Sequence, residues 1–155
     1  MEQTLPKMLR HTAEKYPETN AQYSRTKTGE FIPVNYHDMY QKTLDFAGGL
    51  LKLGEVRGSK IGLISDNREE WEQADLGLLA IGAIDTPRGC DATEQDLAYI
   101  LSFAECPMVI VENTTQVRKI LNIRDKLPLV SRIIAFDPVA EAERADASAN
   151  GISIY

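Results

Sequence analysis

The chain has 155 residues, a length that fits one ordinary domain with a buried hydrophobic core. Hydrophobic residues make up 43% of it and charged residues 26%, values near the soluble globular average that exclude a disordered or fibrous protein. Seventeen lysines and arginines against twenty-three aspartates and glutamates leave a net charge of −6, and no dense basic run occurs. A nucleic-acid partner is therefore not expected.

A membrane-spanning or exported chain is not expected either. The longest apolar run, residues 76–84, is interrupted by Gly77 and Gly82 and falls far short of the roughly 20 residues that span a bilayer. Residues 1–10 lack the basic segment and apolar core of a secretory signal. We therefore expect a cytoplasmic protein without a transmembrane segment.

The two cysteines, Cys90 and Cys106, stand alone in the sequence. Neither has the paired spacing or the nearby His and Cys partners that a zinc site requires. We expect both to be reduced thiols, as in most cytosolic chains, and we expect no metal site.

The first predicted elements are a helix and a hairpin. Apolar residues recur at helical spacing over 5–16, and Pro17 ends the pattern. Two β-prone stretches, 21–26 and 31–34, then flank the turn sequence Lys27–Glu30. This arrangement predicts an antiparallel pair joined by a short turn.

A long helix is predicted next, from Tyr36 to about Leu53. Asn35 is suited to cap its start, and Gly54 is suited to end it. Its predicted inward face consists of Tyr40, Leu44, Ala47 and Leu51. Residues 1–58 thus form a helix–hairpin–helix lead-in.

Residues 60–136 alternate between short apolar runs and amphipathic helices. The predicted strands cover 61–65, 83–87, 108–111 and 129–136, and the predicted helices cover 68–81, 94–104 and 115–127. Three of these helices have a capping residue placed three positions before a reciprocal partner: Asn67 with Glu70, Thr93 with Asp96, and Asn113 with Gln116. The alternation predicts an α/β fold of βαβ units with a mostly parallel sheet, covered on both faces.

The composition changes after residue 136. Residues 137–151 are rich in Ala, Glu, Asp and Ser and contain no aromatic residue, which predicts a weak helix or an exposed linker. Residues 152–155 then begin a new apolar stretch that stops at once. The expected division is therefore a subdomain over 1–136 and a linker or truncated tail over 137–155.

No familiar catalytic or phosphate-binding motif is present. The stretch 54–60 is only superficially similar to a P-loop, because the glycine spacing differs and the stretch precedes a strand. A GxGxxG fingerprint and a GxSxG elbow are both missing from the sequence. His11 and His37 lie on predicted helical segments, and we expect neither to act in a triad or hold a metal.

Two loops are expected at the carboxyl edge of the sheet, where open α/β sheets bind their ligands. Asp66 and Asn67 follow the first strand, and capping of the next helix is expected to account for them. Arg88 and Gly89 follow the second strand and form a cationic, glycine-containing loop that could contact an anionic ligand. An acidic cluster at the strand ends, as in a flavodoxin-like receiver domain, is not evident.

Five stretches in order carry a resemblance to a known family: Thr4–Leu9 with Tyr16–Pro17, Tyr36–Met39 with Gly49–Gly54, Ile64–Trp71 with Ala74–Gly77, Gly82–Gly89, and Leu97–Leu101 with Val109–Val111. They resemble the start of the AMP-forming acyl-CoA synthetases of the adenylate-forming superfamily, most closely the long-chain fatty acid–CoA ligases. Two positions depart from the family's usual wording, since Asn35 stands where Thr is common and Ser59 where Asp is common. Both residues remain compatible with a cap or a turn.

The resemblance implies a two-step ligation. A fatty carboxylate attacks the α-phosphate of Mg-ATP to form acyl-AMP, and the CoA thiol then displaces AMP, so the longer enzyme would use ATP, Mg²⁺ and CoA. The family's phosphate loop, ribose-binding Asp and catalytic Lys have no counterpart in these residues, so no catalytic residue and no metal ligand is expected here. The family loop equivalent to Arg88 and Gly89 lies near the CoA nucleotide channel, which makes these two residues the predicted binding site.

Several interpretations stay open at this stage. The chain could be the N-terminal fragment of a ligase and inactive by itself, a free-standing ligand-binding or interaction module on the same scaffold, or a remnant that binds nothing. A fragment would expose apolar surface that the longer ligase covers, so we expect it to self-associate. The acyl chain length is not set by these residues, and a peripheral membrane position of the longer enzyme is a further alternative.

Overall fold

The computed structural model describes residues 4–26 and 28–155. They form two compact units, and each unit is discontinuous in sequence. The helix–hairpin unit contains the described residues up to Arg57 together with Arg68–Ala83. The sheet unit contains Gly58–Asn67 and Ile84–Tyr155.

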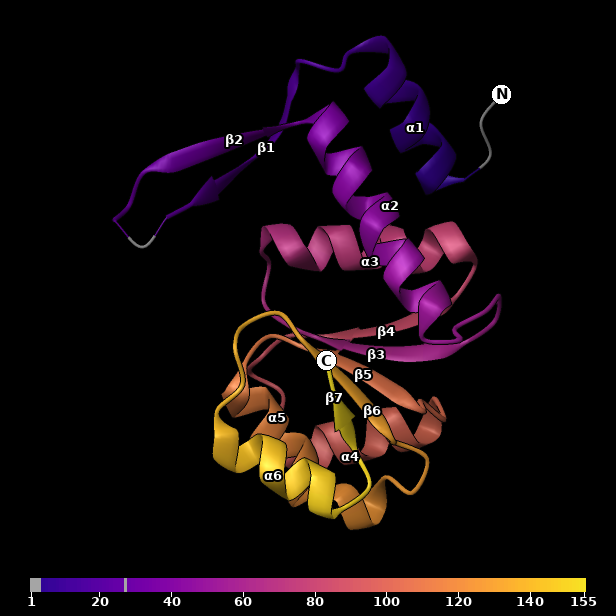
Figure 1. Ribbon diagram of the computed structural model, residues 1–155, viewed down its shortest axis with the longest axis vertical. Helices are drawn as coiled ribbons and strands as arrows, with labels where there is room; N and C mark the ends of the chain where they lie inside the picture. Colours follow the sequence, from indigo (N-terminus) through magenta and orange to yellow (C-terminus); the bar gives the residue numbers. More distant parts are fainter. Residues whose placement is uncertain (1–3, 27) are drawn as a thin grey trace. The chain divides into compact units, whose positions relative to one another are not determined.

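The sheet unit is built on a five-stranded parallel sheet (Figure 1). Its strands are β3 (Lys60–Ile64), β4 (Ile84–Arg88), β5 (Met108–Val111), β6 (Arg132–Ala135) and β7 (Ser153–Ile154). They lie in the order β4-β3-β5-β6-β7, and every neighbouring pair is parallel. The predicted α/β class with a parallel sheet is therefore confirmed.

Three helices of the sheet unit lie on the same side of this sheet (Figure 1). They are α4 (Glu94–Phe103), α5 (Thr114–Asn122) and α6 (Glu141–Ala149), and the short 3₁₀ helix η1 (Arg124–Lys126) follows α5. One hydrophobic cluster joins side chains of β5, β6 and these helices, including fully buried Leu97, Val109 and Ile120. The burial of this shared face explains why the short strands hold their register. The prediction that helices also cover the opposite face of this sheet remains a prediction.

Residues 137–151, for which the sequence predicts a weak helix or an exposed linker, contain helix α6, and strand β7 lies in the apolar stretch 152–155 that follows. Ala147 and Ile152 are buried in the same hydrophobic cluster as the sheet. Strand β7 pairs with β6 through Arg132–Ser153 and Ile133–Ile154. Alanine does not signal burial strongly in a sequence, but Ala147 is completely buried here, while the other alanines of α6 are exposed. The boundary at residue 136 remains a prediction.

The helix–hairpin unit contains α1 (Leu5–Lys15), β1 (Asn20–Arg25), β2 (Phe31–Asn35), α2 (Tyr36–Lys52) and α3 (Glu69–Ile81). Strands β1 and β2 pair antiparallel, which confirms the hairpin, although Lys27 of its expected turn lies outside the described residues. Glu69 at the start of α3 accepts hydrogen bonds from the Ser24 hydroxyl of the hairpin and the Lys42 ammonium of α2. One carboxylate therefore links three elements of this unit.

Helix α2 is confirmed, but its predicted inward face is only partly right: Ala47 is buried and Tyr40 is half-buried, while the two leucines of that face are exposed. The buried residues are Met39, Thr43, Ala47 and Leu50, whereas Leu44 is 41% exposed and Leu51 is 55% exposed. The contact with α3 favours this face, because a Cβ on Gly77 would lie only 3.0 Å from Phe46 Cδ1 of α2 and 3.4 Å from the Thr43 carbonyl oxygen. The face of α2 that contains Thr43 can be buried because the facing helix α3 has a glycine at the contact, which leaves room for close packing.

The predicted helix caps are partly right. Thr93 and Asp96 form the complete capping box of α4, and the Asn113 side chain accepts from the first turn of α5. The expected cap by Asn67 is wrong, because α3 starts after Arg68 without a side-chain cap. Instead, the first turn of α3 carries the carboxylates of Glu69, Glu70 and Glu72. Their negative charge stabilises the helix start by interacting with the positive end of the helix dipole.

Among the residues that the structure describes, we find no helix with the length and apolar character needed to cross a membrane.

Candidate functional site

Three loops meet at the carboxyl edge of the parallel sheet. The strand register aligns Ile64 at the end of β3 with Arg88 of β4 and with Val111 of β5. The residues that follow these strands therefore lie at one edge. Because β4 lies on one side of β3 while β5, β6 and β7 continue on the other, the strand order reverses between β3 and β5. Open α/β sheets bind their ligands at such a switch point.

Glu112, the first residue after β5, is the centre of the hydrogen bonding at this edge. Its Oε2 accepts from the Ser65 hydroxyl at 3.1 Å, from the Asp66 backbone N–H at 3.0 Å and from the Cys90 thiol at 3.4 Å. Its Oε1 accepts from the Asn113 side-chain amide at 3.1 Å. This one carboxylate ties the end of β5 to the loops after β3 and β4.

Asp66 makes a second connection to the loop after β4. Its Oδ1 accepts from the Cys90 backbone N–H at 2.9 Å, so its role is to hold this loop and not to cap α3 as the sequence suggested. Gly89 lies against the neighbouring carboxylates, since a Cβ there would be 2.8 Å from Asp91 Oδ1 and 3.5 Å from Asp66 Oδ1. A larger residue at position 89 would have to displace the Asp91 side chain.

Lys119 of α5 holds the same loop from its other end. Its ammonium donates to the backbone carbonyls of Cys90 at 2.8 Å and Ala92 at 2.9 Å. The Ala92 N–H in turn donates to the Gly89 carbonyl at 3.2 Å, which closes a turn. Residues 89–92 are thus held by side chains from three other segments of the chain.

The Cys90 thiol is strongly shielded from ionisation. Its partial burial raises its pKa to about 11, and the hydrogen bond to Glu112 and the charge of that carboxylate act in the same direction. The thiolate is the reactive form of cysteine, so a thiol with this pKa is a poor nucleophile at neutral pH. The thiol therefore serves as a hydrogen-bond donor here.

Arg88 and Gly89, the two predicted binding residues, lie at this edge. The backbone carbonyl of Arg88 accepts from the Ser65 N–H at 3.0 Å, while its side chain is exposed. Its charge also acts on Asp96, whose pKa is lowered first by the hydrogen bonds from Thr93 and to a smaller degree by Arg88. The guanidinium thus lies near the start of α4, and its binding role remains a prediction.

The carboxylates at this edge raise the question of a metal ion. Asp66, Cys90 and Glu112 each offer one ligand atom, and these three atoms lie within 4.8 Å of one another. Mg²⁺ takes oxygen ligands in near-octahedral geometry, and a thiol must lose its proton before it binds a metal. The raised pKa of Cys90 opposes that loss, and the carboxylate oxygens already accept hydrogen bonds. These residues do not fit Mg²⁺, and their arrangement instead joins the loops.

Sequence reasoning missed Glu112 and the acidic group that it forms with Asp66. The two residues are 46 positions apart, and only the parallel register of β3 and β5 brings them together. One signal was available, because a glutamate that directly follows a fully buried apolar strand falls at the ligand-binding edge of an α/β sheet.

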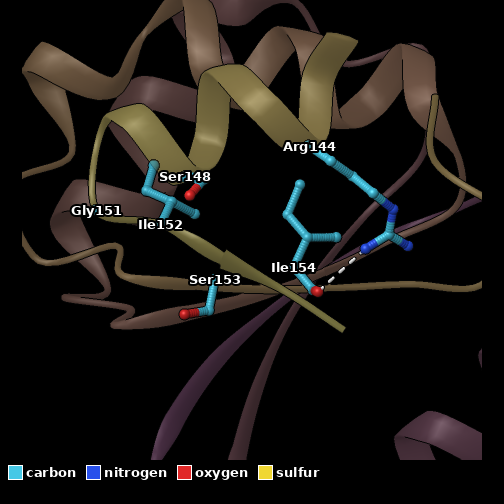
Figure 2. Close-up of a pocket in the computed structure, with 6 residues that line it drawn as sticks. All are labelled: Arg144, Ser148, Gly151, Ile152, Ser153 and Ile154. Carbon is cyan, nitrogen blue, oxygen red and sulfur yellow. Dashed lines mark hydrogen bonds between the residues drawn. The ribbon is translucent and has the colours of Figure 1, made fainter. Parts of the chain in front are cut away.

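A separate hollow of about 380 Å³ opens beside β7 at the edge of the sheet (Figure 2). Figure 2 shows the Arg144 side chain reaching along α6 toward β7, where it donates to the Ile154 carbonyl at 3.3 Å. Edge strands present free backbone groups that invite pairing with other chains, and charged side chains guard them. The Arg144 guanidinium is already hydrogen-bonded to the Ile154 carbonyl. We therefore interpret the hollow as part of a protected strand edge and not as a ligand site.

Comparison with known proteins places this geometry in context. Residues 9–153 match the family model of the AMP-binding enzymes. A long-chain-fatty-acid–CoA ligase of Xenopus laevis is 26% identical over 141 residues, which are 91% of this chain and 19% of that protein. A chloroplastic long-chain-fatty-acid–acyl-carrier-protein ligase of Arabidopsis thaliana is 32% identical over 109 residues, 70% of this chain and 15% of that protein. The chain therefore spans about a fifth or less of the length of these relatives.

The fold has a similar counterpart among solved structures. The A domain of the carboxylic acid reductase from Segniliparus rugosus, in complex with AMP and a co-purified carboxylic acid, superposes with a TM-score of 0.80. The match covers 97% of this chain and 28% of that one at 17% sequence identity. At this identity the likeness shows a common fold and nothing more.

Proposed function

Because the chain belongs to the family of AMP-binding enzymes, we propose that it forms the N-terminal part of an ATP-dependent, AMP-forming long-chain fatty acid–CoA ligase. The proposed reaction converts ATP, a fatty acid and CoA into acyl-CoA, AMP and pyrophosphate through an acyl-AMP. The observation that carries this proposal is the match of 91% of the chain to a long-chain-fatty-acid–CoA ligase.

We propose that these 155 residues give the ligase structural support and that other parts of the ligase carry out the chemical step. Attack on the α-phosphate needs preorganised positive charge around the polyphosphate. The described carboxyl edge instead gathers the carboxylates of Asp66, Asp91 and Glu112, and the Lys119 ammonium there is already bound to the carbonyls of Cys90 and Ala92. We therefore assign the binding of ATP and Mg²⁺ to parts of the ligase that these residues do not include, and we expect the chain alone to be inactive.

Arg88 and Gly89 are proposed to contact the nucleotide part of CoA. Arg88 is exposed at the switch-point edge, and a guanidinium forms charge-assisted hydrogen bonds with phosphate. Gly89 has no side chain, so a ligand can approach its backbone closely. Because carboxylates lie beside this loop, we expect a weak contact that contributes to a larger CoA site.

Calorimetric titration of the 155-residue chain with CoA, with ATP–Mg²⁺ and with a long-chain fatty acid tests this proposal, together with an assay for pyrophosphate release. We expect no pyrophosphate and a weak CoA affinity that Arg88→Ala abolishes and the control Lys126→Ala preserves, since Lys126 is exposed on η1. Pyrophosphate release would contradict the assignment of the chemistry to other parts of the ligase. Binding of the fatty acid or ATP without CoA would favour the alternative, a free-standing ligand-binding or interaction module.

We also propose that the chain by itself self-associates through apolar surface that the longer ligase covers. Tyr99 and Phe103 on α4 are 70% and 80% exposed, and their rings stack with centroids 6.0 Å apart. Contact with a second protein surface would remove both rings from water, which favours association at this pair.

A cytoplasmic location is the proposal for the chain, with a peripheral membrane position of the longer ligase as the alternative. Cys90 and Cys106 are free in the structure, as is usual in a reducing compartment. Fractionation of cells that express the tagged chain tests this, since recovery with the membranes would favour the alternative.

A further inference from the structure

We propose that Glu112 is a positioning residue for the ligand-binding loop: its carboxylate, at the end of β5, holds residues 88–92 in the conformation that presents Arg88 to the ligand. This inference rests on the proposed role of Arg88 and Gly89 in binding CoA. It assigns control of that contact to a residue that does not itself touch the ligand.

Two arms run from Glu112 to the loop. In the direct arm, the Cys90 thiol donates to Glu112 Oε2 at 3.4 Å. In the second arm, the Asp66 N–H donates to the same oxygen at 3.0 Å, and Asp66 Oδ1 accepts from the Cys90 N–H at 2.9 Å. Both arms end at Cys90, one residue from Gly89 and two from Arg88. A change at Glu112 therefore reaches the binding residues through the backbone.

The described hydrogen-bond donors to Glu112 are all neutral: the Ser65 hydroxyl, the Asp66 N–H, the Cys90 thiol and the Asn113 amide. The residue thus works through the number and direction of its acceptor lone pairs. Its negative charge beside an anion-binding loop would by itself weaken the binding of phosphate. Positioning and charge consequently predict opposite effects on CoA binding when Glu112 is replaced by alanine.

The test compares Glu112→Ala and Asp66→Ala with the matched controls Glu112→Gln and Asp66→Asn in the 155-residue chain. Alanine at position 112 removes both arms, whereas the oxygen of a glutamine there can still accept from the Asp66 N–H and the Cys90 thiol. Asparagine at position 66 keeps the acceptor for the Cys90 N–H, whereas alanine removes it. The readouts are hydrogen exchange in a peptide that covers 88–92, with the β5 peptide as an internal reference, and the affinity for CoA.

We expect faster exchange of 88–92 in Glu112→Ala and an affinity for CoA about tenfold weaker, because the binding-competent fraction of the loop falls to about a tenth. Asp66→Ala should behave like Glu112→Ala, and the exchange of 88–92 in Glu112→Gln and Asp66→Asn should stay near that of the wild type. Exchange in β5 should not change, which separates a local effect from general destabilisation.

Unchanged loop exchange in Glu112→Ala, or CoA binding that becomes tighter in this variant, would overturn the inference, since Glu112 would then act through its charge alone. If the wild type and Arg88→Ala bind CoA equally poorly, the proposed CoA contact fails. The exchange data then decide the positioning role by themselves: faster exchange confined to 88–92 supports it, and an unchanged rate overturns it.

Discussion

Cys90 and Glu112 show how much a single residue depends on its neighbours in this protein. In the sequence, Cys90 is an unpaired thiol and Glu112 is a charged residue after a strand. In the structure, they share a hydrogen bond that shields the thiol and joins two loops. Neither role follows from residue type, because the two residues are 22 positions apart in sequence.

The raised pKa of Cys90 predicts a specific pH dependence of stability. The thiol titrates near 9.0 in the unfolded chain and near 11 in the folded one, so the folded state binds more protons between these values. The free energy of unfolding should therefore fall as the pH rises through this window. Cys90→Ser keeps a hydroxyl donor but has no thiol to titrate, so its stability should fall less than that of the wild type.

Urea unfolding at about pH 8 and about pH 10.5 measures this difference for both proteins. The pKa of Cys106 is also raised, mainly by burial, and Cys106 is present in both chains, so its effect cancels in the comparison. Equal losses of stability in the two proteins would show that Cys90 titrates in the folded state as it does in the unfolded one.

At the scale of the elements, close packing decides what the hydrophobic pattern leaves open. Helix α2 has apolar residues on more than one stripe, and the approach of Gly77 in α3 selects the stripe with Thr43 and Ala47. The same principle applies to the sheet, where Gly62 of β3 lets α4 approach. A Cβ on Gly62 would lie 2.5 Å from Leu101 Cδ2.

Gly62→Ala is expected to lower the free energy of unfolding by about 1–3 kcal/mol, because buried Leu101 has little room to move away. Gly48→Ala is the matched control. Gly48 lies inside α2, and a Cβ there would meet no atom of the other described elements within 4 Å, so alanine should raise stability by about 0.5–1 kcal/mol. Chemical denaturation measures both variants, and equal effects would contradict the packing argument.

At the scale of the whole molecule, the units do not follow the order of the sequence. Helix α3 lies between β3 and β4 in the chain, yet it belongs to the helix–hairpin unit with α1 and α2. The expected split into a lead-in over 1–58 and an alternating region over 60–136 does not separate these units. Contacts between distant segments, and not sequence boundaries, define them.

Self-association through α4 is a prediction at this scale. Phe103→Asp should shift the chain toward the monomer, because it places a charge in the exposed Tyr99–Phe103 pair. Ser102→Asp adds the same charge at an exposed neighbouring position and keeps the aromatic pair, so it should leave association unchanged. Sedimentation velocity over a range of concentrations measures both, and a wild type that stays monomeric throughout would contradict the proposal.

The sequence alone determined helices α1 to α5 and most strand positions, the parallel α/β class and the family. These features rest on signals within a few residues, such as the Thr93–Asp96 capping box or the apolar run of β5. It also placed Arg88 and Gly89 at the edge of the sheet, since a loop that follows a parallel strand must lie there.

Only the tertiary structure decided which side chains meet at that edge and which face of α2 is buried. The link between Asp66 and Glu112 spans 46 residues and exists because parallel register brings the ends of β3 and β5 together. Local patterns carry no information about such a pairing. Register and close packing depend on all the elements at once, so they become definite only when the chain folds.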